Sequence, residues 1–401
     1  MHYTRRAFLT ASAGLALGTR MAAATAQGAN DRIRIGIIGT GGRARGLMND
    51  LKKLPGQEQV AVCDVYEPRL LQAAEIAGPA VTKVADYRKI LDDRTIDAVV
   101  IGSPDHWHKT MTLDAVSAGK DVYVEKPVSH SIAEGAEMVK AIEASKQIVQ
   151  TGTQQRSWDH WILGKDIVDS GRLGQITFVQ MYWYQHARAG TYAPVLMDKL
   201  DWKGWLGPAP DQPFRPERFY QWRHFWDFGG GCLTDLMTHW IDVVHWYMGV
   251  DAPLSAQATG RNYQIKLWEA PDTVNATLEY PKSFMTAYLG TYVSRVDDGG
   301  LEFRGDRGTL KIDRARLAVY RDDAAYAAGT LTPEPDIYVR SSGDGTLTHL
   351  QNWLDCIRSR KTPNANIRVA HEAARASQIA NTAMREARLV RWNSTAARIE
   401  R

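Results

Sequence analysis

Short apolar runs alternate with amphipathic segments along the first 153 residues. The apolar runs, rich in Ile and Val, stand at 33–38, 59–63, 98–101, 121–124 and 148–151. Helical patterns separate them at 47–51, 68–77, 87–91, 109–118 and 131–145. Strands that are apolar on both faces and separated by helices predict a buried parallel sheet with ligands at its carboxyl edge. The pattern therefore predicts an α/β domain over residues 31–153.

The pattern changes after residue 153. A crossing helix is expected at 157–170, and β-rich or alternating runs follow at 176–184, 254–260, 273–280, 283–293, 301–304 and 309–312. Such runs predict a mostly antiparallel sheet. The long, aromatic and irregular segment 201–228 indicates a pocket-building insertion. Helical patterns at 347–358 and 369–388 are expected to pack back on the first domain, and residues 154–401 are assigned to a second, substrate-binding α+β domain.

Length and composition agree with two globular domains. The chain has 401 residues, of which 44% are hydrophobic and 23% charged, which excludes a disordered protein. No apolar run reaches the ~18 residues that a membrane-spanning helix needs. Cys63, Cys232 and Cys356 are odd in number and far apart, so buried thiols are expected rather than a disulfide.

The first 26 residues have the layout of an export signal. Arg5 and Arg6 precede Phe8-Leu9, a short apolar stretch follows, and small residues end it at Ala26. Paired arginines before Phe-Leu resemble the twin-arginine type, which predicts a periplasmic or otherwise exported protein. This segment carries three arginines and no acid, which leaves 46 basic and 45 acidic residues in the remainder. A body so close to neutral gives no electrostatic argument for nucleic acid or for an anionic membrane.

A nucleotide-binding fingerprint follows the first predicted strand. Gly39-Thr40-Gly41-Gly42-Arg43-Ala44 matches Gly-x-Gly-x-x-Ala and leads into a helix, where backbone amides can approach a pyrophosphate. Asp64 ends the second predicted strand, 25 positions after Gly39. A carboxylate there accepts the ribose hydroxyls and repels a 2′-phosphate. NAD is therefore the expected cofactor, and NADP is the alternative if Arg43 or Arg69 holds a phosphate.

Further motifs lie at the expected sheet edge and in the second half. These are Ser-Pro-x-x-x-His at 103–108, Glu125-Lys126-Pro127, and Gly-Gly-Gly-x-x-x-Asp-x-x-x-His at 229–239. With the fingerprint, they resemble the Gfo/Idh/MocA oxidoreductases over essentially all of the chain after residue 26. The resemblance implies a Rossmann domain followed by a domain whose open, mostly antiparallel sheet carries the substrate pocket and is a candidate for homo-oligomer contact. At the sheet edge we expect the cofactor to meet Ser103, Pro104, His108, Glu125, Lys126 and Gln154.

Lys126, Asp235 and His239 are the candidate catalytic residues. A helix after the glycine run would place Asp235 and His239, four positions apart, on one face, so that the carboxylate orients the imidazole. Lys126 lies at a strand end beside the expected nicotinamide. Two donors on one carbinol oxygen suit hydride transfer, because that oxygen becomes a carbonyl.

No metal site is predicted. His239, Asp242 and His245 are spaced three apart and drift around a helix by about 60° per step, so Asp242 and His245 are expected to be structural. His106 and His108 are explained by a loop at the cofactor edge. Arg156, Trp222 and Arg223 are candidate substrate contacts, although a solvated arginine at a helix start explains Arg156 nearly as well.

The substrate class is inferred from the tryptophans. Ten of the 13 tryptophans lie between residues 158 and 268, and their density around Trp202, Trp205, Trp222 and Trp226 favours a carbohydrate, whose apolar ring face pairs with an aromatic face. The predicted function is thus NAD(P)-dependent oxidation of a hydroxyl of a sugar, sugar derivative or cyclitol.

Free NAD is scarce outside the cytoplasm, which motivates a tightly bound nucleotide recycled in place. Two alternatives remain open. One is a redox-neutral, NAD-dependent glycoside hydrolase that uses transient oxidation and elimination, although the Glu-Lys-Pro motif favours the oxidoreductase. The other is a non-catalytic sugar-binding protein, against which the intact set of Lys126, Asp235 and His239 argues.

Overall fold

The computed structural model describes residues 32–187, 190, 192–323, 327, 329 and 333–400. The predicted export signal at residues 1–26 lies outside this part of the chain. Residues Ile33–Arg401 form one compact unit. In the described residues, no helix is long and apolar enough to cross a bilayer.

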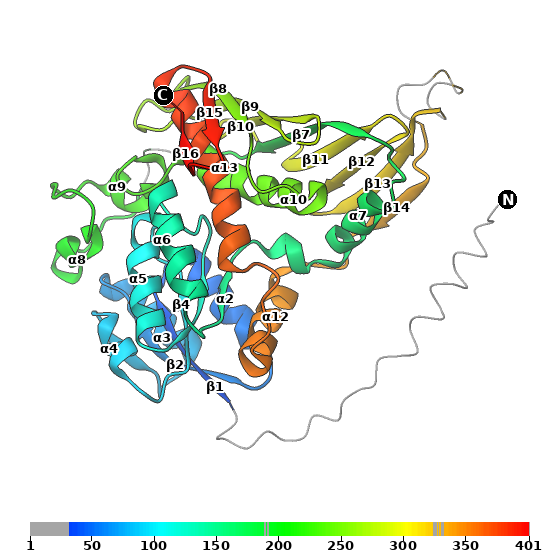
Figure 1. The fold of residues 1–401 in the computed structure, drawn as a ribbon. Helices are drawn as coiled ribbons and strands as arrows, with labels where there is room; N and C mark the ends of the chain where they lie inside the picture. Colours follow the sequence, from blue (N-terminus) through cyan, green and yellow to red (C-terminus); the bar gives the residue numbers. More distant parts are fainter. Residues whose placement is uncertain are drawn as a thin grey trace. The chain divides into compact units, whose positions relative to one another are not determined.

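The first sheet is parallel and six-stranded, in the order β3-β2-β1-β4-β5-β6 (Figure 1). Its strands are β1 (Ile33–Ile38), β2 (Gln57–Cys63), β3 (Thr82–Val84), β4 (Ala98–Ile101), β5 (Asp121–Val124) and β6 (Val149–Thr151). The helices between them are α2 (Gly42–Leu51), α3 (Glu67–Ala77), α4 (Arg88–Asp92), α5 (Asp105–Ser117) and α6 (Ile132–Glu143). The strand order reverses between β1 and β4, which is where a doubly wound sheet binds its ligand. The predicted Rossmann architecture is confirmed.

Helix α5 begins four residues earlier than predicted. His106 and His108, which we expected on a loop, lie in its first turn, because Pro104 at the N-cap sets the backbone angles that open the helix. Both side chains are buried. This places the end of the Ser-Pro-x-x-x-His motif inside the domain rather than on its surface.

The second sheet is ten-stranded, in the order β14-β13-β12-β11-β7-β10-β9-β8-β15-β16. Its strands are β7 (Ile176–Tyr184), β8 (Ser255–Arg261), β9 (Thr273–Tyr280), β10 (Phe284–Thr291), β11 (Gly299–Gly305), β12 (Gly308–Asp313), β13 (Arg316–Arg321), β14 (Ile337–Arg340), β15 (Val390–Asn393) and β16 (Arg398–Ile399). Only β7 and β10 pair in parallel, and the other neighbours are antiparallel. The predicted mostly antiparallel sheet is confirmed.

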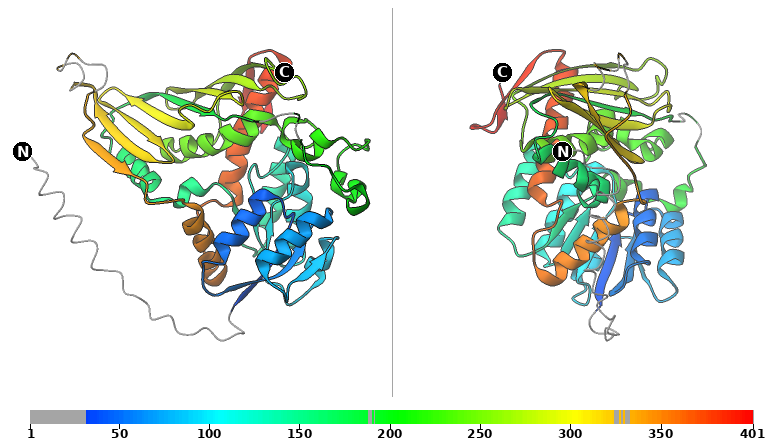
Figure 2. Two further views of the ribbon diagram at one scale, coloured as in Figure 1. Left: turned by 180° about the vertical axis from the view of Figure 1, so that it is seen from behind. Right: turned by 90° about the vertical axis from the view of Figure 1, so that its right-hand side faces the viewer.

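One face of this sheet packs on helices and the other is open (Figures 1 and 2). Residues alternate along β7, where Val179, Met181 and Trp183 are buried. On the opposite face of β10, Met285 and Leu289 are 43% and 38% exposed. Pairing of two chains through this face stays a prediction.

The remaining helices connect the sheets. They are η2 (Gln154–Ser157), α7 (Asp159–Asp169), η3 (Met197–Lys199), α8 (Trp202–Leu206), α9 (Pro216–Tyr220), η4 (Trp222–His224), η5 (Leu233–Met237), α10 (Thr238–Met248), α12 (Thr346–Ser359) and α13 (Ile367–Glu386). The insertion over residues 201–228 is mostly irregular, with short helices held by aromatic contacts. Trp202 and Trp205, for example, stack with ring centroids 4.8 Å apart.

The last two helices complete the core of the first sheet. Leu350, Trp353 and Leu354 of α12 join the cluster that contains β1 and α2, while Ile367 and Ala370 of α13 join the cluster that contains α5 and α6. Helix α13 also contacts β8 and α10. Both faces of the first sheet are therefore buried by residues from the far end of the chain, which fixes the second sheet beside the carboxyl edge of the first.

Candidate active site

A cleft of about 690 Å³ opens at the switch point of the first sheet. One wall comes from the carboxyl edge and the other from the insertion. Of the predicted cofactor residues, those that line it are Gly39, Gly41, Gly42, Arg43, Asp64, Ser103 and Pro104. The insertion contributes Asp201, Lys203, Gly204, Trp205, Gly207, Tyr220, Trp222 and Arg223.

The glycine turn after β1 has the geometry of a pyrophosphate cradle. Gly39 has φ of +76°, and a Cβ there would lie 2.7 Å from the Ser103 backbone nitrogen. A Cβ at Gly41 or Gly42 would meet open space. Because no side chain caps the N-terminus of α2, its first amides can donate to phosphate oxygens. The turn therefore fits a dinucleotide.

Asp64 lines the cleft at the end of β2. One carboxylate oxygen accepts from the Thr40 amide at 2.8 Å and from its hydroxyl at 3.0 Å, while the other accepts from the Tyr66 amide at 2.9 Å. These bonds hold Asp64 beside the turn, and the oxygen that accepts only from Tyr66 keeps acceptor capacity for a ribose hydroxyl. Thr40 itself is fully buried and acts through Asp64.

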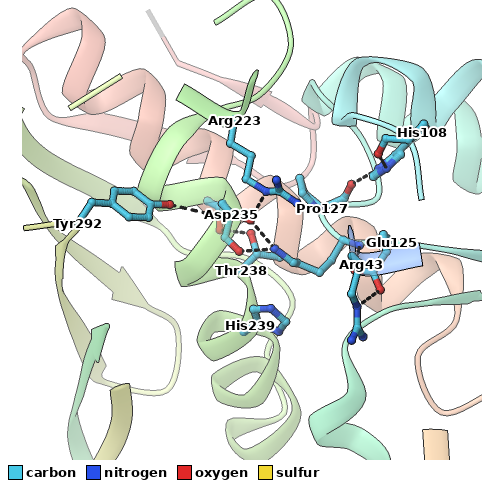
Figure 3. A network of polar contacts seen from close by, with 12 residues as sticks. Arg43, His108, Glu125, Pro127, Arg223, Asp235, Thr238, His239 and Tyr292 are labelled. Atoms are coloured by element: carbon cyan, nitrogen blue, oxygen red, sulfur yellow. Dashed lines mark hydrogen bonds and ion pairs between the residues drawn. The ribbon is translucent and has the colours of Figure 1, made fainter. Parts of the chain in front are cut away.

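Arg43 and Glu125 form an ion pair across the carboxyl edge. The Arg43 Nε lies 2.7 Å from the Glu125 Oε1. Burial alone would raise the pKa of Glu125, but Arg43 and then Lys126 outweigh it and lower that pKa. Glu125 is thus an ionised, buried carboxylate that orients Arg43 (Figure 3). It does not line the cleft itself.

His108 joins two loops of the same edge. Its Nδ1 lies 2.7 Å from the Pro127 carbonyl oxygen and its Nε2 lies 3.0 Å from the Ser103 carbonyl oxygen. Burial is the main cause that lowers its pKa. The side chain positions the Ser103 and Pro127 loops and does not line the cleft (Figure 3).

Lys126 and Asp235 bring the two halves of the chain together. The Lys126 Nζ donates to the Asp235 Oδ1 at 2.6 Å and to the Asp235 backbone oxygen at 2.7 Å. Asp235 also accepts from Arg223 at 3.2 Å and from the Tyr292 hydroxyl at 3.2 Å (Figure 3). Burial would raise the pKa of Asp235, but Lys126 and then Arg223 outweigh it and hold that pKa well below its usual range.

Asp235 does not pair with His239 as we predicted. No hydrogen bond joins the two side chains in the described part of the chain. Residues Leu233–Met237 form a π turn, and His239 lies in the α-helix that follows. The Asp235 carboxylate accepts from Lys126, Arg223 and Tyr292 instead, and these donors occupy it.

His239 lies below Asp235 in the view of Figure 3. Its Nδ1 lies 3.4 Å from the Gln155 Oε1, and its ring centroid lies 5.4 Å from that of Trp183. Burial lowers the pKa of His239 well below its usual value, and the nearby Lys126 and Arg314 lower it further. The imidazole is therefore neutral at neutral pH.

Arg156 and Gln154 do not reach the cleft. Arg156 donates from Nε to both Asp242 oxygens at 2.9 Å and is almost fully buried. Gln154 is buried, and its Oε1 has no partner in the described residues.

His245 pairs with the Tyr280 hydroxyl at 2.9 Å. In the described residues no three His, Cys, Asp or Glu side chains gather as metal ligands, and all three cysteines are buried and free.

The tryptophan-rich insertion lies on the nucleotide side of the cleft. Trp205, Trp222 and Arg223 line it, and Trp202 packs on Trp205, whereas Trp226 lies under Arg385. These rings fill an insertion that has little regular structure. The ring beside His239 is Trp183 of β7.

Sequence reasoning missed Trp183, Gln155, Tyr292 and Arg314. Gln155 directly follows Gln154, and Tyr292 follows β10, which ends at the site. For Trp183, the alternation of β7 gives a signal, because it shares a face with Val179 and Met181. No local pattern distinguishes Tyr292 or Arg314 from other strand-end residues.

Comparisons with known proteins agree with this geometry. Residues 33–153 match the model described as oxidoreductase family, NAD-binding Rossmann fold, and residues 194–391 match the C-terminal alpha/beta domain of the same family. The inositol 2-dehydrogenase of Rubrobacter xylanophilus is 33% identical over 304 residues, which cover 74% of this chain and 75% of that protein.

Two solved structures share the fold. A levoglucosan dehydrogenase in complex with NADH and levoglucosan aligns with a TM-score of 0.72 at 18% identity, covering 90% of this chain and 99% of that one. Myo-inositol 2-dehydrogenase from Lactobacillus plantarum aligns with a TM-score of 0.69 at 22% identity, with the same coverage. The chain therefore belongs to the Gfo/Idh/MocA family of oxidoreductases, and its first domain is of the NAD-binding Rossmann type.

Proposed function

We propose that the protein oxidises a hydroxyl of a sugar or cyclitol, with Lys126 and His239 acting on the same carbinol oxygen. The observation that carries the proposal is the hydrogen bonding of the Lys126 ammonium group. An ammonium has three N–H donors, and Asp235 takes two of them. The third N–H is left to donate to a substrate oxygen beside the nucleotide cleft.

His239 supplies the base. Its Nδ1 faces Oε1 of the Gln155 side chain, which can only accept a hydrogen bond, and Nδ1 therefore carries the proton. The lone pair of Nε2 is then free to accept a proton from the substrate hydroxyl. The neutral state that burial and Lys126 impose is the state a base requires. Lys126 stabilises the negative charge that develops on the oxygen as its proton leaves. When bound, NAD supplies the hydride acceptor.

The neighbourhood of His239 supports a ring-shaped polyol. Trp183 is buried against His239, so that an aromatic wall lies beside the imidazole, which suits the C–H groups of a sugar ring. The relatives named for inositol and levoglucosan support the same class.

Mass spectrometry of nucleotide released from purified protein, followed by a sugar and cyclitol panel, tests the proposal. Oxidised product with a change in nucleotide absorbance supports it. Released monosaccharide without net redox would favour glycoside cleavage, and a melting shift without product would favour a binding protein.

A substitution isolates the proposed role of Lys126. Lys126→Met is expected to lower kcat about 10²- to 10³-fold while the nucleotide content stays unchanged, because Lys126 does not line the nucleotide cleft. Lys109→Met, which removes only a surface ion pair with Glu137, is the matched control. Full activity in Lys126→Met would exclude this role.

We also propose that the nucleotide is retained and recycled in place. The segment 196–207 crosses to the first domain and is held there by several contacts. The Asp201 amide donates to the Val65 carbonyl at 2.9 Å, the Trp107 indole donates to the Trp205 carbonyl at 2.9 Å, and Lys199 pairs with Glu67 at 3.0 Å. Asp201, Lys203 and Trp205 also line the cleft. Release of a nucleotide therefore requires the segment 196–207, which we call the strap, to move away from the first domain.

Export through the twin-arginine route remains a further proposal, supported by Arg5-Arg6 and the small residues before Ala26. Replacing both arginines by lysine in the full chain, followed by cell fractionation, tests it. We expect the variant to stay in the cytoplasm. An exported variant would contradict a twin-arginine signal.

A further inference from the structure

Arg314 is a cation without a polar partner next to the candidate catalytic residues. It lies in the tight turn between β12 and β13, where the Asp313 carboxylate accepts from the amides of Ala315 and Arg316. Its Nε is buried and unbonded, and within the described residues its side chain makes no hydrogen bond and no ion pair. A buried guanidinium nitrogen is ordinarily bonded, so this one needs an explanation.

The guanidinium lies over the aromatic platform of the site. Its carbon is 4.5 Å from the Trp183 ring centroid and 6.0 Å from that of Trp240. Trp183 in turn lies against His239, with ring centroids 5.4 Å apart. A single indole thus separates the guanidinium from the proposed base. The stack holds the planar group in place while its N–H edge stays free for a ligand.

Neighbouring carboxylates do not neutralise Arg314 at contact distance. Asp298 and Asp344 act on it electrostatically. However, Asp344 accepts from the Thr346 amide at 2.7 Å, and Asp298 lies 3.7 Å from Arg295. Arg43 contributes further positive charge and is itself paired with Glu125. Lys126 and Arg223 share the carboxylate of Asp235, and Arg314 is a further cation of this neighbourhood that has no carboxylate at contact distance among the described residues.

We propose that Arg314 binds a carboxylate carried on the ring of the substrate, so that the enzyme acts on a sugar acid such as a hexuronate. A guanidinium offers two parallel N–H donors that match a carboxylate, which explains an arginine at this position. The assignment rests on the proposed function, because it places the substrate beside His239.

The test compares matched substrates on the nucleotide-loaded enzyme. D-Glucuronate is paired with D-glucose and D-galacturonate with D-galactose. We expect kcat/KM to be at least about 10-fold higher for the acids, and Arg314→Gln to raise KM for the acids about 10- to 100-fold with little change for the neutral sugars. Arg314→Lys keeps the positive charge but lacks the two parallel N–H donors, so its KM for the acids should lie between those of the unaltered enzyme and of Arg314→Gln. Arg316→Gln, on the same turn and exposed, is the control.

Two outcomes overturn the assignment: no preference for the acids in the unaltered enzyme, or an equal loss on acids and neutral sugars in Arg314→Gln. A thermal-shift series with the same sugars separates this failure from that of the proposed function. Stabilisation by hexuronates that Arg314→Gln abolishes, without any oxidation, would support the subsite and exclude the dehydrogenase. Oxidation of neutral sugars with no effect of hexuronates would exclude only the subsite.

Discussion

Gly39 stands where the backbone itself contacts the cofactor site. Its φ of +76° and the 2.7 Å approach of a Cβ to the Ser103 nitrogen exclude a side chain. Gly39→Ala is expected to cost at least about 1–2 kcal/mol from the backbone angle alone and to lower the nucleotide content of the purified protein. Gly46→Ala is the control, because Gly46 lies in α2 with open space around its Cα and alanine there should stabilise by about 1 kcal/mol.

Urea unfolding and nucleotide quantification check both variants. A Gly39→Ala protein with normal nucleotide content would show that the turn does not cradle the pyrophosphate.

The pKa of His239 leads to a prediction about pH. A base must be deprotonated to act, and burial with Lys126 lowers the pKa of His239 well below 6.5. Activity should therefore persist as the pH falls through 6.5, where an exposed histidine would already be protonated. The acid limb of a kcat/KM profile measured against a sugar substrate is expected to have its midpoint below pH 6.5. A midpoint at or above 6.5 would contradict a buried, neutral base.

At the level of single residues, the sequence motifs predicted where the candidate site residues lie in the fold better than which residues they contact. The glycine turn and Asp64 lie where the fingerprint places them, because the spacing of strand, turn and helix is local. The partner of Asp235 was not predictable in the same way, because Lys126, which donates to it, lies 109 positions earlier in the chain. Arg156 was a candidate for substrate binding, yet it is paired with Asp242, which lies 86 positions further along the chain.

Among the secondary-structure elements, the strap over the nucleotide cleft carries its own prediction. Trp107→Phe keeps an aromatic ring but removes the hydrogen bond to the Trp205 carbonyl. A loss of about 1 kcal/mol should raise the nucleotide dissociation rate roughly 5-fold, because release requires the strap to open. Trp226→Phe, whose ring lies under Arg385, serves as control.

Dissociation is followed by trapping released nucleotide with a coupled enzyme. Equal rates in Trp107→Phe and the unaltered protein would indicate that the strap does not limit release.

Element prediction succeeded where periodicity was strong. Strand β9 was placed residue for residue, and β7 likewise, because apolar and polar positions alternate in both. Strands β3, β13, β14, β15 and β16 were missed. They are short or carry charged ends, and β14 shows no buried residue at all. Such strands form because a neighbouring strand provides backbone hydrogen-bond partners, and the sequence of the strand itself does not show this.

For the whole molecule, the first sheet takes part of its core from helices that follow the second sheet in the chain, and this sets how the protein unfolds. Trp353 of α12 is fully buried, with its ring centroid 5.7 Å from that of Tyr123 in β5. Trp353 also belongs to the cluster that contains Ile35 and Leu47. The first sheet is thus closed on one face by α12 and on the other by α13, both of which follow the second sheet in the chain. The core of the first sheet is therefore incomplete without the end of the chain, and α13 also packs in the core of the second sheet.

Trp353→Ala should therefore destabilise the nucleotide-binding half although the substitution lies about 200 positions beyond it. Truncation of a buried tryptophan is expected to cost about 3–5 kcal/mol, and bound nucleotide should be lost in the same urea transition as far-ultraviolet circular dichroism. Trp226→Ala removes a partly exposed ring and should cost about 1 kcal/mol. Release of the nucleotide at an unchanged urea concentration, while only part of the helical signal shifts, would contradict this prediction. It would mean that the nucleotide-binding half folds without the packing of Trp353 on the first sheet, because loss of a core residue should otherwise destabilise that whole half.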